Sequence, residues 1–584
     1  MTTLAAPTIY HLSIERFRGI KALSWHPGKG VNLILGGGDV GKTTILDAIA
    51  LLLSPTNATV VADTDYHDRD DDAGFSIEAV IALPPASGID HLTKHAWPWS
   101  WDGTQAVVPR ARDGAGTQSA VYRLRVRGTD ELELAYEIVQ PDGSVDNLPV
   151  ALRRAIGLVR LSGDDRNDRD LRFVQGSALD RLLSDKGLRA RIAKELVQSN
   201  VSDALSVDAR GTLQKLDAAF VEEDLPHGLN ISITGGQGAS VASLVGLTAQ
   251  RNAVQLPLSS WGSGTRRLSA LAITEQNQGD SPVTLVDEVE RGLEPYRQRV
   301  LMAKLQEGRS QAFITTHSPA AISAASNAAL WYVDHAGKIG PLDGAKIEAH
   351  RAHDPETFLA RLSIVAEGKT EVGFVSGMVA RAFQSALQRH GVHVTDGRGH
   401  DTAIGVLEAL DQGGLLFGGF ADDEGRHQGS WATLRAHLGG LLFRWESGDL
   451  ESNVIGWVPD ERLEDLLVDP AGEKTTWRLA SLAMRLEIPQ TDLDFATIKA
   501  AAGSGLKALI IEAAQGTVPT GKEDEKKKFK NHAKAWFKTV EGGGELETKM
   551  FSLGAWSKVK DLLLPFCNSV RKAVDLAELD DLLP

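Results

Sequence analysis

The sequence predicts an α/β protein with two domains, and three observations support this fold class. An apolar strand, a glycine-rich loop and a helical stretch follow one another at 31–53. Two further apolar strands flank a helical stretch at 282–316, and strand–loop–helix order begins again at 363–421. The chain of 584 residues is too long for one core. We therefore expect one domain over 1–349 and a second over 350–584.

The bulk composition is that of a globular protein. Hydrophobic residues make up 42% of the chain and charged residues 24%, which is typical of folded domains. No apolar run approaches the roughly 20 residues of a membrane-spanning helix, and residues 1–20 lack the apolar stretch of a secretion signal. Cys567 is the single cysteine, so neither a disulfide framework nor a cysteine-based zinc site is expected. We expect a cytoplasmic protein with no membrane partner.

The other elements follow from local patterns along the chain. Residues 8–16 alternate in polarity as a strand does, and strands are also predicted at 75–83 and 118–139. From 163 to 222 the sequence becomes helical and charged without sustained heptads. This stretch is too short for a long coiled-coil arm, so we predict a helical dimerisation insert at 163–222. About the last 110 residues are predicted to be mostly helical.

The loop between the first apolar strand and its helix is predicted to bind phosphates. Its sequence, Gly36-Gly-Gly-Asp-Val-Gly-Lys-Thr43, fits G-x4-G-K-[ST] in the required strand–loop–helix context. Backbone N–H groups of the loop and the helix N-terminus would hold the phosphates of ATP. The lysine would reach the β- and γ-phosphates, and the first threonine hydroxyl would ligate Mg²⁺. The expected ATP-binding residues here are Gly36, Gly38, Gly41, Lys42, Thr43 and Thr44.

Two acids at the end of the next apolar strand predict the rest of the nucleotide site. Asp287 would hold the Mg²⁺ shell, and Glu288 would polarise the attacking water. Many strands end in acids, so the flanking sequence carries the assignment. Ser260-Trp-Gly-Ser-Gly-Thr-Arg-Arg-Leu268 lies upstream and Ile314-Thr-Thr-His317 lies downstream. Taken alone, His317 would be explained as a structural histidine; in this series it is a candidate catalytic residue.

Along the chain these segments resemble the motifs of the ABC ATPase superfamily in their usual order: Walker A, signature loop, Walker B, D-loop near 290–295, and switch histidine. The opening 14–20 (Ile-Glu-Arg-Phe-Arg-Gly-Ile) resembles its DNA-handling branch, which includes RecF-like, SMC-like and OLD (overcoming lysogenization defect) proteins. The resemblance implies that Ser263 and Gly264 of one subunit close on the ATP of another. A homodimer or higher homo-oligomer is therefore expected through the ATPase domain. Gly262 departs from the serine common in these families, which implies slow hydrolysis.

Two acidic clusters predict a metal site in the second domain. Glu367 ends one strand and Glu371 follows it, while Asp422 and Glu424 follow another apolar stretch. Carboxylates at neighbouring strand ends are the hard oxygen ligands of Mg²⁺ or Mn²⁺, and phosphodiester cleavage uses such ions to activate water. Taken singly, Glu371 would be explained as a helix-N-terminal acid and the other pair as a solvated turn. Together they favour a metal site.

This half resembles the Toprim domain of topoisomerases, primases and OLD nucleases, through Glu367 in E-G-x-x-E and the D-x-D-like pair. Glu424 stands where a second aspartate is usual, and Asp423 is the alternative. An ABC ATPase followed by Toprim resembles the OLD family, class 2, which includes the nuclease half of the Gabija system. The resemblance implies ATP-regulated DNA cleavage in phage defence or repair, Mg²⁺ or Mn²⁺ at both sites, and a helicase partner as in some relatives. Glu464 is our candidate for completing the metal shell, and Glu451 is the alternative.

The same resemblance implies a catalytic lysine in the C-terminal segment. Seven lysines crowd this segment: Lys522, Lys526, Lys527, Lys528, Lys530, Lys534 and Lys538. Most would lie on a solvated helix face and contact DNA phosphates, which makes binding salt-dependent. Lys534, beside Trp536 and Phe537, is the one expected to face the active site. Since the net charge of −15 argues against a surface coated for DNA, a local groove is expected.

Two other functions are compatible with these residues. One is a non-nucleolytic ATP-dependent DNA clamp or sensor, in which the carboxylates serve structure. The other is a primase- or topoisomerase-like enzyme. A topoisomerase needs a nucleophilic tyrosine, and all six tyrosines lie before the Toprim segment. A plasmid-nicking assay separates nuclease from clamp.

Overall fold

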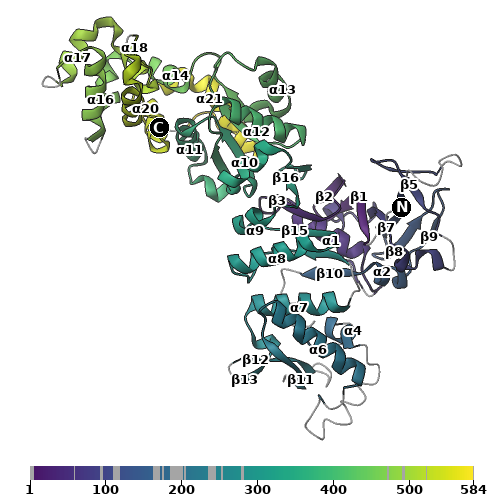
Figure 1. The fold of residues 1–584 in the computed structure, drawn as a ribbon. Helices are drawn as coiled ribbons and strands as arrows, with labels where there is room; N and C mark the ends of the chain where they lie inside the picture. Colours follow the sequence, from purple (N-terminus) through teal and green to yellow (C-terminus); the bar gives the residue numbers. More distant parts are fainter. Residues whose placement is uncertain are drawn as a thin grey trace. The chain divides into compact units, whose positions relative to one another are not determined.

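Contacts divide the chain into two compact units (Figure 1). The first comprises Met1–Leu35 and Gly41–Trp331, and the second comprises Gly36–Val40 and Tyr332–Pro584. The predicted boundary near 350 falls inside α10 (Ala345–His353), in the second unit. The structure is a computed structural model that describes residues 6–57, 59–92, 96–109, 119–161, 171–173, 177–183, 202, 205–233, 245–251, 254–277, 282–469, 473–489, 493–520 and 522–582.

An antiparallel sheet begins the first unit. Its strands are β1 (Thr8–Phe17), β2 (Ile20–Trp25), β4 (Phe75–Ala82), β5 (Trp99–Trp101), β6 (Ala106–Val107), β7 (Ser119–Gly128), β8 (Leu134–Val139) and β9 (Val145–Asn147). They run in the order β2-β1-β4-β7-β5-β6, with β8 pairing β7 and β9. In β7, buried Leu124 and Val126 alternate with Arg125 and Arg127, which form ion pairs with Glu137 of β8. One face therefore packs on the core, and the other carries charge.

A second sheet forms the centre of the first unit, and four of its strands are parallel to one another. Its strands are β3 (Val31–Gly36), β10 (Leu158–Leu161), β14 (Val283–Val286), β15 (Ala312–Thr315) and β16 (Ala329–Val333). These five lie in the order β10-β14-β15-β3-β16. Its helices are α1 (Lys42–Leu52), α2 (Val150–Ile156), α7 (Ser263–Asn277), α8 (Pro295–Glu307) and α9 (Pro319–Ala324). Buried Gln311, just before β15, joins this sheet to β1 by accepting from Ile9 N and donating to Ile9 O, at 2.7 and 3.0 Å.

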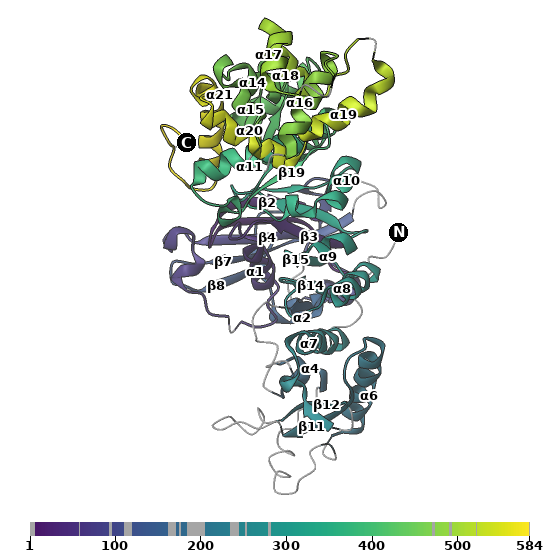
Figure 2. The same ribbon diagram turned by 90° about the vertical axis from the view of Figure 1, so that its left-hand side faces the viewer.

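The predicted insert at 163–222 is described only in part. Within it, the described residues form α4 (Ala178–Leu183) and α6 (Val207–Glu222), and the stretches 162–170 and 184–201 lie outside the described residues. Strands follow it that the sequence pattern did not predict, namely β11 (His227–Ile233), β12 (Val245–Arg251) and β13 (Val254–Pro257). They form an antiparallel sheet grouped with α4, α6 and α7 (Figures 1 and 2).

A four-stranded parallel sheet lies at the centre of the second unit, after β17 (Ile339–Pro341) and α10. Its strands are β18 (Leu362–Ala366), β19 (Val392–Asp396), β20 (Gly418–Ala421) and β21 (Leu442–Arg444), in the order β19-β18-β20-β21. The connecting helices are α11 (Lys369–Phe383), α12 (His400–Gln412) and α13 (Gln428–Leu438). The chain leaves β18 for β19 and then returns past β18 to β20. Such a reversal of strand order opens a crevice at the carboxyl ends of the two strands where it occurs.

The rest of the second unit is helical, as the sequence predicts. Its helices are α14 (Leu450–Gly456), α15 (Leu463–Leu467), α16 (Glu473–Arg485), α17 (Phe495–Ala502), α18 (Leu506–Gln515), α19 (Lys526–Ala535), α20 (Val540–Ser552) and α21 (Trp556–Ala573) (Figure 2). In the described part of the chain, no helix has the length and apolar character needed to cross a membrane.

Two glycines let the backbones of α11 and α20 touch. A Cβ atom on Gly373 of α11 would lie 1.8 Å from the carbonyl oxygen of Val540. A Cβ atom on Gly543 of α20 would lie 2.0 Å from that of Thr370. No side chain fits at either position. The first turn of α20, and with it the residues that lead into α20, is therefore held against the first turn of α11.

Candidate functional site

The predicted phosphate-binding loop joins β3 to α1. Gly36 and Gly41 have φ values of 139° and 94°, which glycine adopts at little cost. Helix α1 then begins at Lys42, whose side chain is buried, and Ile45 N donates to Gly41 O at 3.1 Å. The N–H groups at a helix start are suited to bind phosphate oxygens.

The two predicted Mg²⁺ ligands of the nucleotide site are in contact. The Thr43 hydroxyl donates to Asp287 Oδ1 at 3.1 Å. Thr315, at the end of β15, donates to the same oxygen at 2.6 Å and accepts from the backbone N–H of Glu288 at 2.8 Å. Glu288 has a positive φ of 50°, so the chain turns sharply at the catalytic candidate. The sequence analysis missed Thr315, although it directly precedes Thr316 and the switch histidine.

Glu290 organises the segment that carries His317. Its Oε1 accepts from the backbone N–H of His317 and its Oε2 from the Thr316 hydroxyl, both at 2.7 Å. Burial and the nearby Lys42 lower the pKa of the His317 imidazole, against the opposing effect of Glu290 and Glu288. The imidazole is therefore neutral at neutral pH, and its unprotonated nitrogen can accept a hydrogen bond from an attacking water or from a protonated phosphate oxygen.

The signature segment is attached to the Walker B segment by one buried arginine. Arg267 of α7 donates to the backbone carbonyls of Asp287, of Glu288 at 2.6 Å and of Arg291 at 2.9 Å. Burial lowers the pKa of its guanidinium to about 10, so the group stays charged at neutral pH. At the start of the same helix, a Cβ on Gly264 would lie 2.0 Å from a carbonyl oxygen of the D-loop. Helix α7 and the D-loop therefore pack backbone to backbone.

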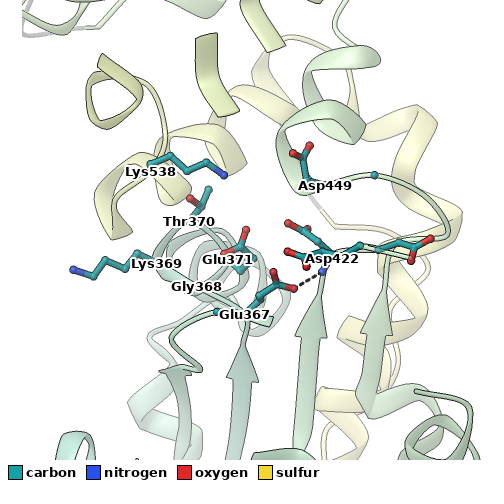
Figure 3. Close-up of a pocket in the computed structure, with 12 residues that line it drawn as sticks. Glu367, Gly368, Lys369, Thr370, Glu371, Asp422, Asp449 and Lys538 are labelled. Carbon is teal, nitrogen blue, oxygen red and sulfur yellow. Dashed lines mark hydrogen bonds between the residues drawn. The ribbon is translucent and has the colours of Figure 1, made fainter. Parts of the chain in front are cut away.

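The second unit holds a cavity of about 560 Å³ at the carboxyl ends of β18 and β20, which we name the acid pocket (Figure 3). It is lined by Glu367, Gly368, Lys369, Thr370, Glu371, Gly399, Asp422, Asp423, Glu424, Gly448, Asp449 and Lys538. The predicted acids Glu367 and Glu371 lie beside Asp422 although 55 positions separate the first from the last in the sequence. The strand-order reversal between β18 and β20 brings them together.

The three central acids of the pocket are almost fully buried. Glu367 Oε2 accepts from Asp422 N at 3.1 Å, and Asp422 Oδ1 accepts from Leu450 N at 3.0 Å. Burial, together with the neighbouring Glu371 and Glu367, strongly raises the pKa of Asp422. Burial and Glu451 raise the pKa of Glu371. Such a cluster holds protons in the absence of a cation, and a divalent ion would relieve the repulsion between its carboxylates.

Two lysines line the pocket: the side chain of Lys538 extends toward the acids, whereas that of Lys369 extends away from them (Figure 3). The ammonium of Lys538 lies 2.6 Å from a carboxylate oxygen of Glu451, whose side chain is fully buried. Burial alone would lower the pKa of Lys538, but Glu451, Glu371 and Asp422 raise it, so the ammonium is charged. Lys538 lies two residues before α20, and the close contact between α20 and α11 places it over the acids.

Curated relatives match only a short segment. The DNA replication and repair protein RecF of Nitrosococcus oceani is 50% identical over 44 residues, and RecF of Teredinibacter turnerae is 44% identical over 46. Each match covers 8% of this chain and 12% of the relative.

Several solved structures are similar to the chain. An Smc head bound to the C-winged helix domain of ScpA has 16% sequence identity and a TM-score of 0.37, and the match covers 59% of this chain and 99% of that chain. A RecF–ATPrS structure has 14% identity and a TM-score of 0.35, with 59% of this chain and 100% of that chain covered. The SMC head from Thermotoga maritima has 14% identity and a TM-score of 0.28, with 58% of this chain and 100% of that chain covered.

Two family models match the first unit. An AAA domain model matches residues 11–220, and a model described as "AAA domain, putative AbiEii toxin, Type IV TA system" matches residues 142–323. The first unit contains an AAA/ABC-type ATPase domain. Lys42 and Thr43, the residues expected to bind ATP, lie within the stretch that the AAA domain model matches. The acid pocket lies outside the stretches that match the ATPase models.

Not all predicted residues lie where the sequence analysis put them. Lys534 is exposed on α19, because Phe529 and Ala533 form the buried face of that helix, and the pocket lysine is Lys538 instead. Glu464 is exposed on α15, whose leucines pack inward, and it does not line the acid pocket.

Other predicted acids lie at the rim of the pocket or below it. Glu424 is exposed at the rim and pairs with Arg426. Asp423 pairs with Arg444, so it is partly neutralised. The alternative ligand Glu451 is buried beneath the pocket. Asp449, which lines the pocket and caps α14, was missed by the sequence analysis.

Proposed function

We propose that the protein is an ATP-regulated, divalent-metal-dependent DNA endonuclease that resembles the class 2 OLD nucleases, with a Toprim-like active site in the second unit. The observation that carries the proposal is the acid pocket. Glu367, Glu371 and Asp422 converge at a strand-order reversal, where open parallel sheets bind ligands. A charged lysine faces the same space.

The chemistry expected of the pocket is phosphodiester hydrolysis. Buried carboxylates would hold Mg²⁺ or Mn²⁺, and the ions would activate water and stabilise the leaving oxygen. The ammonium of Lys538 would stabilise the negative charge that develops on the phosphate. Asp449 and Glu424 at the edges of the pocket are available as further oxygen ligands.

A basic helix leads to this pocket and supports DNA as the substrate. Lys526, Lys527, Lys528 and Lys534 are exposed on α19, which ends three residues before Lys538. The neighbouring α16 exposes 57% of Trp477. Cations contact phosphates and an exposed indole stacks on unpaired bases, so this face suits a DNA strand. The acidic net charge of the chain is compatible with such a local groove.

Nucleotide would act through the ATPase domain. In the resemblance to ABC proteins, Ser263 and Gly264 of one subunit complete the ATP site of another, so ATP would favour a homodimer. A helicase partner and a role in phage defence or DNA repair belong to the same proposal.

Plasmid nicking tests the proposed function. We expect the full-length protein to convert supercoiled plasmid to relaxed or linear DNA with Mn²⁺ or Mg²⁺, and EDTA to abolish the conversion, because the pocket acids need a cation. ATP should change the rate. ATP-dependent DNA retention without any cut product at either metal would contradict the nuclease and support a DNA clamp, the alternative that the RecF similarity favours.

A comparison of two lysines tests the assignment of the pocket. Lys538→Met should lower nicking at least about tenfold, because a transition-state charge loses its cation. Lys534→Met should change nicking by less than about twofold, since that side chain is exposed outside the pocket. Initial rates at saturating Mn²⁺ measure both.

A stability control is needed because Lys538 neutralises the buried Glu451. Removing one partner of a buried ion pair costs about 3–5 kcal/mol. The double variant Lys538→Met/Glu451→Gln removes the unpaired charge and should melt near the wild-type temperature while remaining slow. Equal losses in the Lys534 and Lys538 variants would contradict the assignment.

A further inference from the structure

A histidine lies among the acids of the second unit. His400 is the first residue of α12, directly after Gly399, and only 4% of it is exposed. Its Nδ1 lies 3.2 Å from Glu367 Oε2. Among the described residues, ligand atoms of Glu367, His400 and Glu424 all lie within 4.8 Å of one another.

We propose that Glu367, His400 and Glu424 form a divalent-cation site with mixed nitrogen and oxygen ligands, distinct from an all-oxygen site at Glu371 and Asp422. Imidazole favours borderline transition ions, whereas Mg²⁺ prefers oxygen alone. The site would therefore take Mn²⁺, Co²⁺ or Zn²⁺ in preference to Mg²⁺. The use of this ion in cleavage rests on the proposed function; its binding does not.

The spacing of the ligand atoms fits one ion. Metal–nitrogen and metal–oxygen bonds are about 2.0–2.2 Å long for such ions. Two atoms 3.2 Å apart, each bound to a common ion at that distance, subtend an angle of about 100°, between the octahedral and tetrahedral values. The ion would take the place of the proton between the two side chains. Glu424, at the exposed rim, can reach the ion by a small rotation.

The backbone holds His400 in place before any ion binds. Gly399 has a φ of 102°, and its N–H donates to the carbonyl oxygen of Glu367 at 2.7 Å. The imidazole packs edge-on against Trp431, with centroids 5.6 Å apart, and stacks on His427 at 5.9 Å. A ring fixed on two sides costs little further entropy when it ligates a metal.

The surrounding charges permit a cation here. Arg426 pairs with Glu424 and lies 3.6 Å from Asp401, which His427 also contacts at 3.1 Å. All four groups are exposed or partly exposed, so Arg426 can turn to Asp401 when an ion binds Glu424. The ion thus competes with an exposed arginine rather than with a buried one.

A simpler explanation is that His400 only orients Glu367 by hydrogen bonding. In that arrangement Nδ1 carries the proton, which leaves Nε2 as an acceptor. Nε2 is buried and has no hydrogen-bond partner in the described structure, and a buried unpaired lone pair costs free energy. With a metal on Nδ1, Nε2 would carry the proton instead, so the two arrangements differ in whether this buried position holds a lone pair or an N–H group.

Pulsed electron paramagnetic resonance of bound Mn²⁺ tests the site directly. Nucleotide-free, full-length protein with Mn²⁺ should show coupling of the electron spin to the ¹⁴N of an imidazole. His400→Gln should lose this coupling. Glu424→Gln, a change at an exposed position with little risk to folding, should lower the affinity of the site for Mn²⁺ at least about tenfold. His437→Gln, at an exposed position of α13, is the matched control and should keep the coupling.

Activity adds a second measurement. If the histidine ligates an ion, His400→Gln should lower the ratio of Mn²⁺- to Mg²⁺-supported nicking at least about tenfold, whereas a merely orienting histidine would lower both rates alike. Mn²⁺ bound without nitrogen coupling in wild type, or coupling that survives in His400→Gln, overturns the site. Coupling in a protein that cuts no DNA would uphold the site and reject the proposed nuclease.

Discussion

Asp422→Ala is expected to lower metal-dependent nicking at least about a hundredfold, a loss of about 3 kcal/mol of transition-state stabilisation. Asp422 is buried at the end of β20 beside Glu367 and Glu371, so its removal deletes a ligand where an ion must bind. DNA binding should stay the same or tighten, because a negative charge leaves the pocket. Initial rates of nicking and a DNA-binding titration measure the two effects.

Glu464→Ala is the matched control for this variant. Glu464 belongs to the same unit but is exposed outside the acid pocket, so its loss should change nicking by less than about twofold. Mn²⁺ should raise the melting temperature of wild type and of Glu464→Ala but raise that of Asp422→Ala much less. If Asp422→Ala nicks plasmid as fast as wild type, the carboxylates serve structure and the clamp becomes the better explanation.

Glu288→Gln is expected to abolish ATP turnover while ATP binding remains, with a loss of at least about a hundredfold, typical of a missing general base. Glu288 follows Asp287 at a sharp turn, and its side chain is partly exposed, so an amide fits there without disturbing the fold. Phosphate release measures turnover, and a fluorescent ATP analogue measures affinity.

Lys42→Ala is the comparison that separates binding from hydrolysis. It removes the buried cation at the start of α1 and should abolish nucleotide binding itself. Both variants should retain the metal-dependent signals of the acid pocket. Wild-type turnover in Glu288→Gln would show that another group positions the attacking water.

The parts of the sites that sequence could predict are those set by local pattern. Glycines at 36 and 41 and the lysine after them stand between a strand and a helix, so their role follows from one short segment. Glu367 and Asp422 could be predicted because each follows a buried strand, and parallel strands end at the same edge of their sheet. In the first domain, the order of the ATPase motifs along the chain further supported the assignment of Asp287, Glu288 and His317.

The residues that were missed come from tertiary packing. Lys538 reaches the acids only because Gly373 and Gly543 let α20 lie against α11, and no pattern around Lys538 distinguishes it from its neighbours. The glycine run 542–544 was the available signal, since glycine inside a helix usually marks a close approach. Thr315, Asp449 and His400 likewise depend on contacts between segments far apart in the sequence.

The strand order of the second unit also explains how the proposed activity could be lost while the fold is kept. The chain leaves β18 in one direction and passes it in the other, so right-handed crossovers put α11 and α12 on opposite faces of the sheet. The path of the chain therefore forms the opening between the strand ends, and the acidic side chains are not needed to keep it open. Natural variants could exchange these acids and keep a stable domain. A relative with the same topology and no carboxylates at these strand ends would be a folded, inactive paralogue, free to bind DNA without cutting it.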